Sequence, residues 1–156
     1  MKKRFHGIFS IVLLIATIAV GLYQVWIHSM AMGGLYILII LLAWPVMIYS
    51  YCAKCECREN GCRHVFVGGM TRLLPARQNT PYSAMDYLGL TVCLAAILGF
   101  PQYWLWQSPL MWIIFSVLPL LAGIEIWLFV CKGCGNTKCP ICVQRNGAAI
   151  DRQIAP

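Results

Sequence analysis

The chain has 156 residues, of which 60% are hydrophobic and only 11% are charged. A water-soluble domain of this length could not remove that much apolar surface from water, and a mean hydropathy of +0.72 agrees with this. The composition excludes an ordinary soluble protein and predicts an integral membrane protein. The net charge of +7 does not indicate nucleic-acid binding, because no basic stripe alternates with stacking aromatic residues.

Four apolar runs predict four transmembrane helices. A short basic head precedes the first run, which is too long for the hydrophobic part of a typical signal peptide. Each run is long enough to cross the hydrocarbon core of a bilayer. The predicted spans cover residues 7–27, 35–51, 87–106 and 110–130.

Polar segments alternate with these apolar runs. The predicted organisation is a first transmembrane hairpin at 1–51, a Cys-rich loop at 52–86, a second hairpin at 87–130 and a Cys-rich tail at 131–156. Each hairpin is followed directly by a Cys-x-x-Cys pair, so that Cys52 and Cys55 correspond to Cys131 and Cys134. We therefore expect an all-α membrane fold in which two hairpins of the same orientation form a parallel repeat.

The basic residues set the expected orientation in the membrane. All twelve Lys and Arg residues lie in the N-terminal head, the central loop or the C-terminal tail, and the two connections on the other side contain none. The positive-inside rule therefore predicts an inner-membrane protein with both termini and the central loop in the cytoplasm. Aromatic residues mark the opposite interface: Tyr23, Trp26, Tyr103, Trp104, Trp106 and Trp112.

Two cysteine clusters follow the second and fourth predicted spans. Cytoplasmic thiols are kept reduced, so thiol clusters on that side more often bind metal or carry out redox chemistry than form structural disulfides. Two thiols on one tight turn can also face the same soft metal ion. The candidate metal ligands are Cys52, Cys55, Cys57, Cys62, Cys131, Cys134, Cys139 and Cys142.

Two ligand arrangements and two metals fit these spacings. Either each cluster binds its own four-thiolate centre, or Cys52, Cys55, Cys131 and Cys134 share one centre and leave the outer thiols for another. The Cys-x-x-Cys knuckles are similar to those of zinc ribbons and rubredoxins, although only four residues separate the two knuckles of the tail. Iron–sulfur clusters take four thiolates from more compact runs, and a proline such as the one after Cys139 is common there. The position at a membrane face favours iron–sulfur.

In layout the chain resembles the NapH-type membrane components of quinol oxidation, which have four spans and cytoplasmic cysteine clusters that pass electrons. The Cys-x-x-x-Cys-Pro motifs of that group are absent here. We expect a small electron-transfer accessory protein in the lipid bilayer rather than a stand-alone enzyme. Its partner would be a soluble redox protein or a larger membrane complex. The alternatives are a zinc-stabilised scaffold or binding module, and a soft-metal transporter or chaperone.

The sequence also predicts roles for four residues outside the cysteine clusters. Glu125 lies inside the fourth predicted span, where an ionisable group is a candidate for proton or quinone handling unless it reaches the nearby interface. Asp86 opens the third span and is expected to stabilise that helix N-terminus. We expect Cys93 to pack as a small apolar residue and Arg77 to bind lipid phosphates.

Overall fold

The computed structural model describes residues 2–55, 69–71, 74–75, 77 and 80–131, and all regular structure in this part of the chain is helical. Four helices are long and apolar enough to cross a membrane: Phe5–His28, Met30–Lys54, Ala84–Leu105 and Pro109–Val130. The prediction of an all-α fold with four helices long and apolar enough to cross a membrane is therefore confirmed for the described residues.

Short elements interrupt or extend three of these spans. In chain order the elements are α1 (Lys2–His28), α2 (Met30–Ser50), the 3-10 helix η1 (Cys52–Lys54), α5 (Ala84–Gly99), α6 (Gln102–Leu105), α7 (Pro109–Glu125) and the π-helical turn η2 (Ile126–Val130). Pro101 separates α5 from α6. Pro109 begins α7 in the first turn, where the N–H that proline lacks has no partner within the helix.

The first hairpin turns at a single residue. Ser29 is extended between α1 and α2, and its hydroxyl accepts a hydrogen bond from the Met32 N–H at 3.4 Å. Because Ser29 caps the second helix, α2 begins at Met30 rather than at residue 35. Gly33 lets α2 pass close to α1, since a Cβ at Gly33 would lie 2.5 Å from Cε3 of Trp26.

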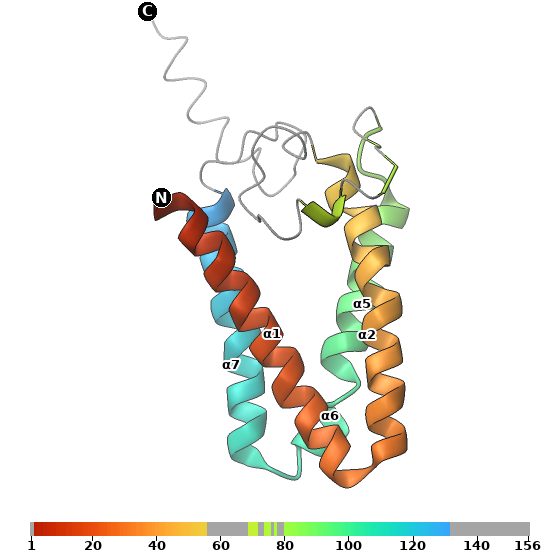
Figure 1. Cartoon of the computed structure of the whole chain (residues 1–156), viewed down its shortest axis with the longest axis vertical. Coiled ribbons are helices and arrows are strands. Elements are labelled where there is room, and N and C mark those ends of the chain that lie inside the picture. Colours follow the sequence, from red (N-terminus) through yellow and green to blue (C-terminus); the bar gives the residue numbers. More distant parts are fainter. Residues whose placement is uncertain (1, 56–68, 72–73, 76, 78–79, 132–156) are drawn as a thin grey trace, which may run out of the picture.

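The long helices pair across the two hairpins. α1 makes its most extensive contacts with α7, and α2 makes its most extensive contacts with α5, while α1 also packs on α2. Figure 1 shows the two pairs meeting at the end that holds α6 and diverging toward the other end. We call these the closed end and the open end. The first arm is α1 with α7 and η2, and the second arm is α2 with η1 and α5.

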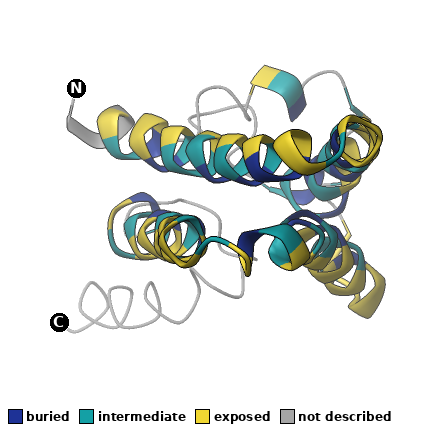
Figure 2. Ribbon diagram, turned by 90° about the horizontal axis from the view of Figure 1, so that it is seen from below, coloured by how far each residue is buried: buried dark blue, intermediate teal, exposed yellow. Residues whose placement is uncertain are grey.

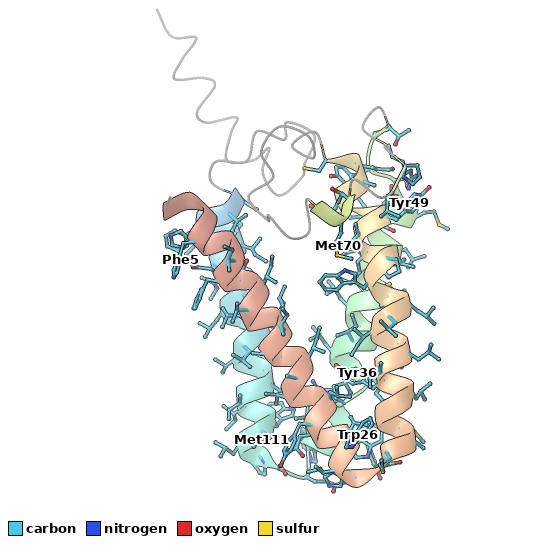
Figure 3. The ribbon with its side chains drawn as sticks, in the orientation of Figure 1. Phe5, Trp26, Tyr36, Tyr49, Met70 and Met111 are labelled. Carbon is cyan, nitrogen blue, oxygen red and sulfur yellow. The ribbon has the colours of Figure 1, made fainter. Side chains whose placement is uncertain are left out.

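The arms are held together by a packed junction near the closed end. Tyr36 of α2 is fully buried there, its hydroxyl donates to the Ile97 carbonyl at 2.8 Å, and its ring stacks on Phe100 at 5.5 Å between centroids. Gly21 of α1 meets the same junction, because a Cβ on it would lie 2.9 Å from Cε2 of Phe115 and 3.2 Å from the Tyr36 hydroxyl. Figure 3 shows Tyr36 near the closed end of α2.

Small and polar residues line the buried face of α1. Ser10, Thr17 and Gln24 recur at every seventh position and are all buried. The hydroxyls of Ser10 and Thr17 donate to carbonyls of their own helix at 3.0 and 2.9 Å. Small side chains such as those of Ser10 and Thr17 let two membrane helices approach closely. This stripe therefore suits α1 to close packing against a neighbouring helix.

Large apolar side chains cover much of the outer surface. Figure 2 shows buried residues on the inner faces of the helices and exposed residues over much of the outside. This distribution suits contact with lipid, because a bilayer does not penalise exposed apolar groups. Cys93 is buried in a cluster with Ala43 and Ile97, so the expectation that it packs as an apolar residue is confirmed.

Candidate functional site

The predicted metal ligands that the structure describes all lie at the open end. Cys52 begins η1, Cys55 follows it, and Cys131 directly follows η2. Figure 1 shows η1 and η2 at the open ends of different arms. The other five candidate ligands lie outside the described residues: Cys57, Cys62, Cys134, Cys139 and Cys142.

Cys52 and Cys55 occupy one closed turn at the foot of α2. The Cys55 N–H donates to the Cys52 carbonyl at 3.1 Å, which completes the 3-10 turn of η1. Ala53 and Lys54 between them are buried, whereas both cysteines are half-buried. The turn therefore keeps its central residues inside the protein and its two cysteines nearer the surface. Two thiols on one turn can contact a single metal ion.

Cys131 lies on the other arm, after a π-helical turn. π-helical turns are rare and occur frequently at functional sites. The Cys131 N–H donates to the Ile126 carbonyl, so the cysteine continues the helical backbone. Within the described part of the chain, no three His, Cys, Asp or Glu side chains form a metal-binding group. Both predicted four-thiolate arrangements include cysteines beyond that part, and they stay predictions.

Glu125 has a partner that the sequence did not reveal. Its Oε1 atom lies 2.6 Å from Nδ1 of His6, so the pair joins the end of α7 to the start of α1. The His6 ring stacks on Phe129 of η2 with centroids 4.4 Å apart. The side chains of His6 and Glu125 are 31% and 16% exposed, respectively. An imidazole and a carboxylate in contact can exchange a proton, which is the chemistry expected of Glu125.

Sequence analysis missed the most deeply buried ionic group at the open end. Nζ of Lys54 lies 2.5 Å from Oδ2 of Asp86, and their side chains are only 2% and 5% exposed. The same ammonium donates to the Pro81 carbonyl at 2.8 Å. Nη1 of Arg77 lies 3.3 Å from Oδ1 of Asp86. We call Lys54, Arg77 and Asp86 the ion cluster. Removing one partner from a buried pair is strongly destabilising, since it leaves an uncompensated charge.

Asp86 also caps α5. Its carboxylate accepts hydrogen bonds from the Ser83 N–H at 2.8 Å and the Ser83 hydroxyl at 2.6 Å. These contacts form part of a capping box, so the expectation that Asp86 stabilises this helix N-terminus is confirmed. Arg77, for which lipid phosphates were the expected partner, directs its guanidinium to Asp86 and to the ring of Tyr49, 4.7 Å from the centroid.

Comparison with known proteins gives the chain no family. No protein-family model, no curated protein and no solved structure matches it. Its function must therefore be inferred from its own residues.

Proposed function

We propose that this chain is an inner-membrane electron-transfer accessory protein, whose thiolates hold iron–sulfur centres at the open end. The observation that carries the proposal is the closed Cys52–Cys55 turn at the foot of a membrane span, at the same end as Cys131. Thiolate ligands suit iron–sulfur clusters and zinc rather than magnesium or calcium. The distribution of Lys and Arg supports placing this end in the cytoplasm.

Each arm would supply part of the ligand set. Cys52 and Cys55 would provide two thiolates from one turn, and Cys131 would provide one at the foot of the opposite arm. Cysteines of the central loop and the tail would complete the four thiolates that an iron–sulfur centre requires. When bound, such a centre supplies one-electron transfer. Its position at the end of the spans suits exchange with a soluble redox protein or a larger complex.

Proton handling is assigned to the His6–Glu125 pair. A membrane quinol releases protons together with electrons when it is oxidised. A protein that takes electrons from a quinol therefore needs a nearby proton acceptor. The pair lies on the first arm at the end that carries Cys131, and its two groups are in direct contact. An ionisable residue within a membrane span is a functional candidate by default.

Zinc is the second candidate, because the same closed turn suits a tetrahedral four-thiolate site. A zinc centre would tie the central loop and the tail into a scaffold and would carry no electrons. A soft-metal transporter has less support. Apart from Glu125, the predicted spans hold no charged side chain that could line a path for a cargo ion.

The proposal is tested by the metal and acid-labile sulfide content of the full-length protein, purified anaerobically in detergent. Iron with a matching amount of sulfide supports it, zinc without sulfide favours the scaffold, and no bound metal contradicts both. Replacing Cys52 and Cys55 together by serine should lower the metal content. Cys93→Ala is the matched control, because Cys93 is buried in the core of the second arm and should leave the content unchanged.

A further inference from the structure

The Cys52–Cys55 turn is attached to the rest of the protein through its two central residues. The backbone carbonyl of Ala53 accepts a hydrogen bond from the Arg77 N–H at 3.1 Å. The ammonium of Lys54 is held by Asp86 and by the Pro81 carbonyl. Both contacts come from the segment that leads into α5. The turn is thus fixed through Ala53 and Lys54, the two residues between its cysteines.

The residues around the turn strengthen this attachment. The Tyr82 hydroxyl donates to the Tyr51 carbonyl at 3.2 Å, and the two rings pack with centroids 5.1 Å apart. The Arg77 guanidinium lies over Tyr49, which Figure 3 shows at the open end of α2. Hydrogen bonds and ring contacts between 49–54 and 77–86 therefore hold the backbone of the turn.

The ion cluster also places positive charge in and next to the Cys52–Cys55 turn. It contains two cations, Lys54 and Arg77, and one carboxylate, Asp86. A four-thiolate metal centre is anionic, and a positive charge close to it favours the bound form. Groups that orient metal ligands without touching the metal contribute substantially to affinity. The same cluster can therefore act on both the geometry and the charge of a centre built on this turn.

We propose that Lys54, Arg77 and Asp86 are positioning residues for the half of the metal centre that contains Cys52 and Cys55. They hold the turn in its metal-ready conformation and offset the charge of its thiolates. This inference rests on the proposed function, because it requires that the turn binds metal. It adds that the buried ion cluster serves the site as well as the fold.

The test is a Co²⁺ titration of the reduced, metal-free full-length protein in detergent, followed through the thiolate-to-cobalt charge-transfer absorption. Lys54→Met removes the ammonium and leaves Asp86 paired with Arg77 and Ser83. We expect this variant to bind Co²⁺ about 10- to 100-fold more weakly than the wild type. Losses of this size are typical when a residue that orients metal ligands without touching the metal is replaced. Lys54→Arg keeps a cation and should recover most of the affinity. Met85→Ala is the matched control, because it changes an exposed neighbour of Asp86.

Arg77→Gln provides an independent variant if Lys54→Met does not fold. It leaves the Lys54–Asp86 pair in place, and the Arg77 side chain is 30% exposed, so we expect a folded protein with a smaller loss of affinity. Affinities equal to the wild type in the folded variants would overturn the positioning role while leaving the proposed function intact. A wild-type protein that binds no Co²⁺ through its thiols would overturn both.

Discussion

The two arms have similar outlines, but different chemistry joins their helices at the open end. In the first arm His6 ties α1 to α7 through Glu125 and to η2 through Phe129, and the side chains of His6 and Glu125 are partly exposed. In the second arm Asp86 receives Lys54 and Arg77, and the carboxylate and the ammonium are almost fully buried. The charged groups of the second contact are therefore enclosed by protein, whereas those of the first remain partly accessible.

The two ties nevertheless occupy corresponding places in the topology. Each joins the start of one hairpin's first helix to the end of the other hairpin's second helix: α1 to α7 in the first arm, and α5 to the foot of α2 in the second. A parallel repeat would produce this exchange of partners, although the repeat itself stays a prediction. The comparison teaches that a similar layout can support a deeply buried ion cluster on one side and a partly exposed His–Glu contact on the other.

The largest effect is expected from removing the carboxylate of the second arm. Asp86→Ala leaves Lys54 and Arg77 without their buried counter-charge, and we expect a loss of about 3–5 kcal/mol in the free energy of unfolding. Unfolding in mixed detergent micelles, followed by circular dichroism, measures it. Met85→Ala, next to Asp86 but 74% exposed, is the control. Equal stability of the two variants would show that the ion cluster does not hold the second arm.

The junction that unites the arms should be the next most sensitive place. A Cβ on Gly21 would lie 2.9 Å from Phe115 of the same arm and 3.2 Å from the Tyr36 hydroxyl of the second arm, so Gly21→Ala crowds the junction and should cost about 1–3 kcal/mol. Gly123→Ala makes the same change on α7 where no atom lies within 4 Å, and it should be neutral or stabilising by up to about 1 kcal/mol. The same unfolding assay compares them. A Gly21→Ala protein as stable as the wild type would mean that α1 does not pack closely against Phe115 and Tyr36.

A single hydrogen bond at this junction should contribute less. Tyr36→Phe removes the bond to the Ile97 carbonyl and keeps the ring, so we expect a loss of about 1 kcal/mol. Tyr103→Phe removes the hydroxyl of an exposed tyrosine at the closed end and serves as the control. If both variants unfold alike, the Tyr36 hydroxyl does not link α2 to α5.

The smallest effect on stability is expected in the tie of the first arm. Because His6 and Glu125 are partly exposed, their coupling should be at most about 1 kcal/mol. A double-mutant cycle with His6→Gln and Glu125→Gln measures this coupling. A coupling energy as large as the loss expected for Asp86→Ala would contradict the contrast between the partly exposed contact of the first arm and the buried ion cluster of the second.

The membrane spans could be predicted because length and hydropathy of a continuous run suffice to identify them. The cap formed by Asp86 could also be predicted, since its partner Ser83 is only three residues away. The pairing of helices could not. Hydropathy does not say which helix faces which, and the choice of partner depends on local shape, such as the close approach of Phe115 to Gly21.

The ionic contacts at the open end could not be predicted from the sequence either. Lys54 and Asp86 are 32 positions apart, and His6 and Glu125 are 119 apart, so no periodicity links them. Lys54 was grouped with the basic residues that set topology, although it is almost completely buried. Its position between the two cysteines of one Cys-x-x-Cys motif was the one available signal.

The most direct test of the electron-transfer role is the visible absorption of the anaerobically purified wild-type protein through one cycle of reduction and reoxidation. We predict a broad absorption from thiolate-bound iron that bleaches on reduction and returns on oxidation. A colourless protein that binds zinc and does not change on reduction would contradict an electron-transfer role and leave the thiols as ligands of a structural site.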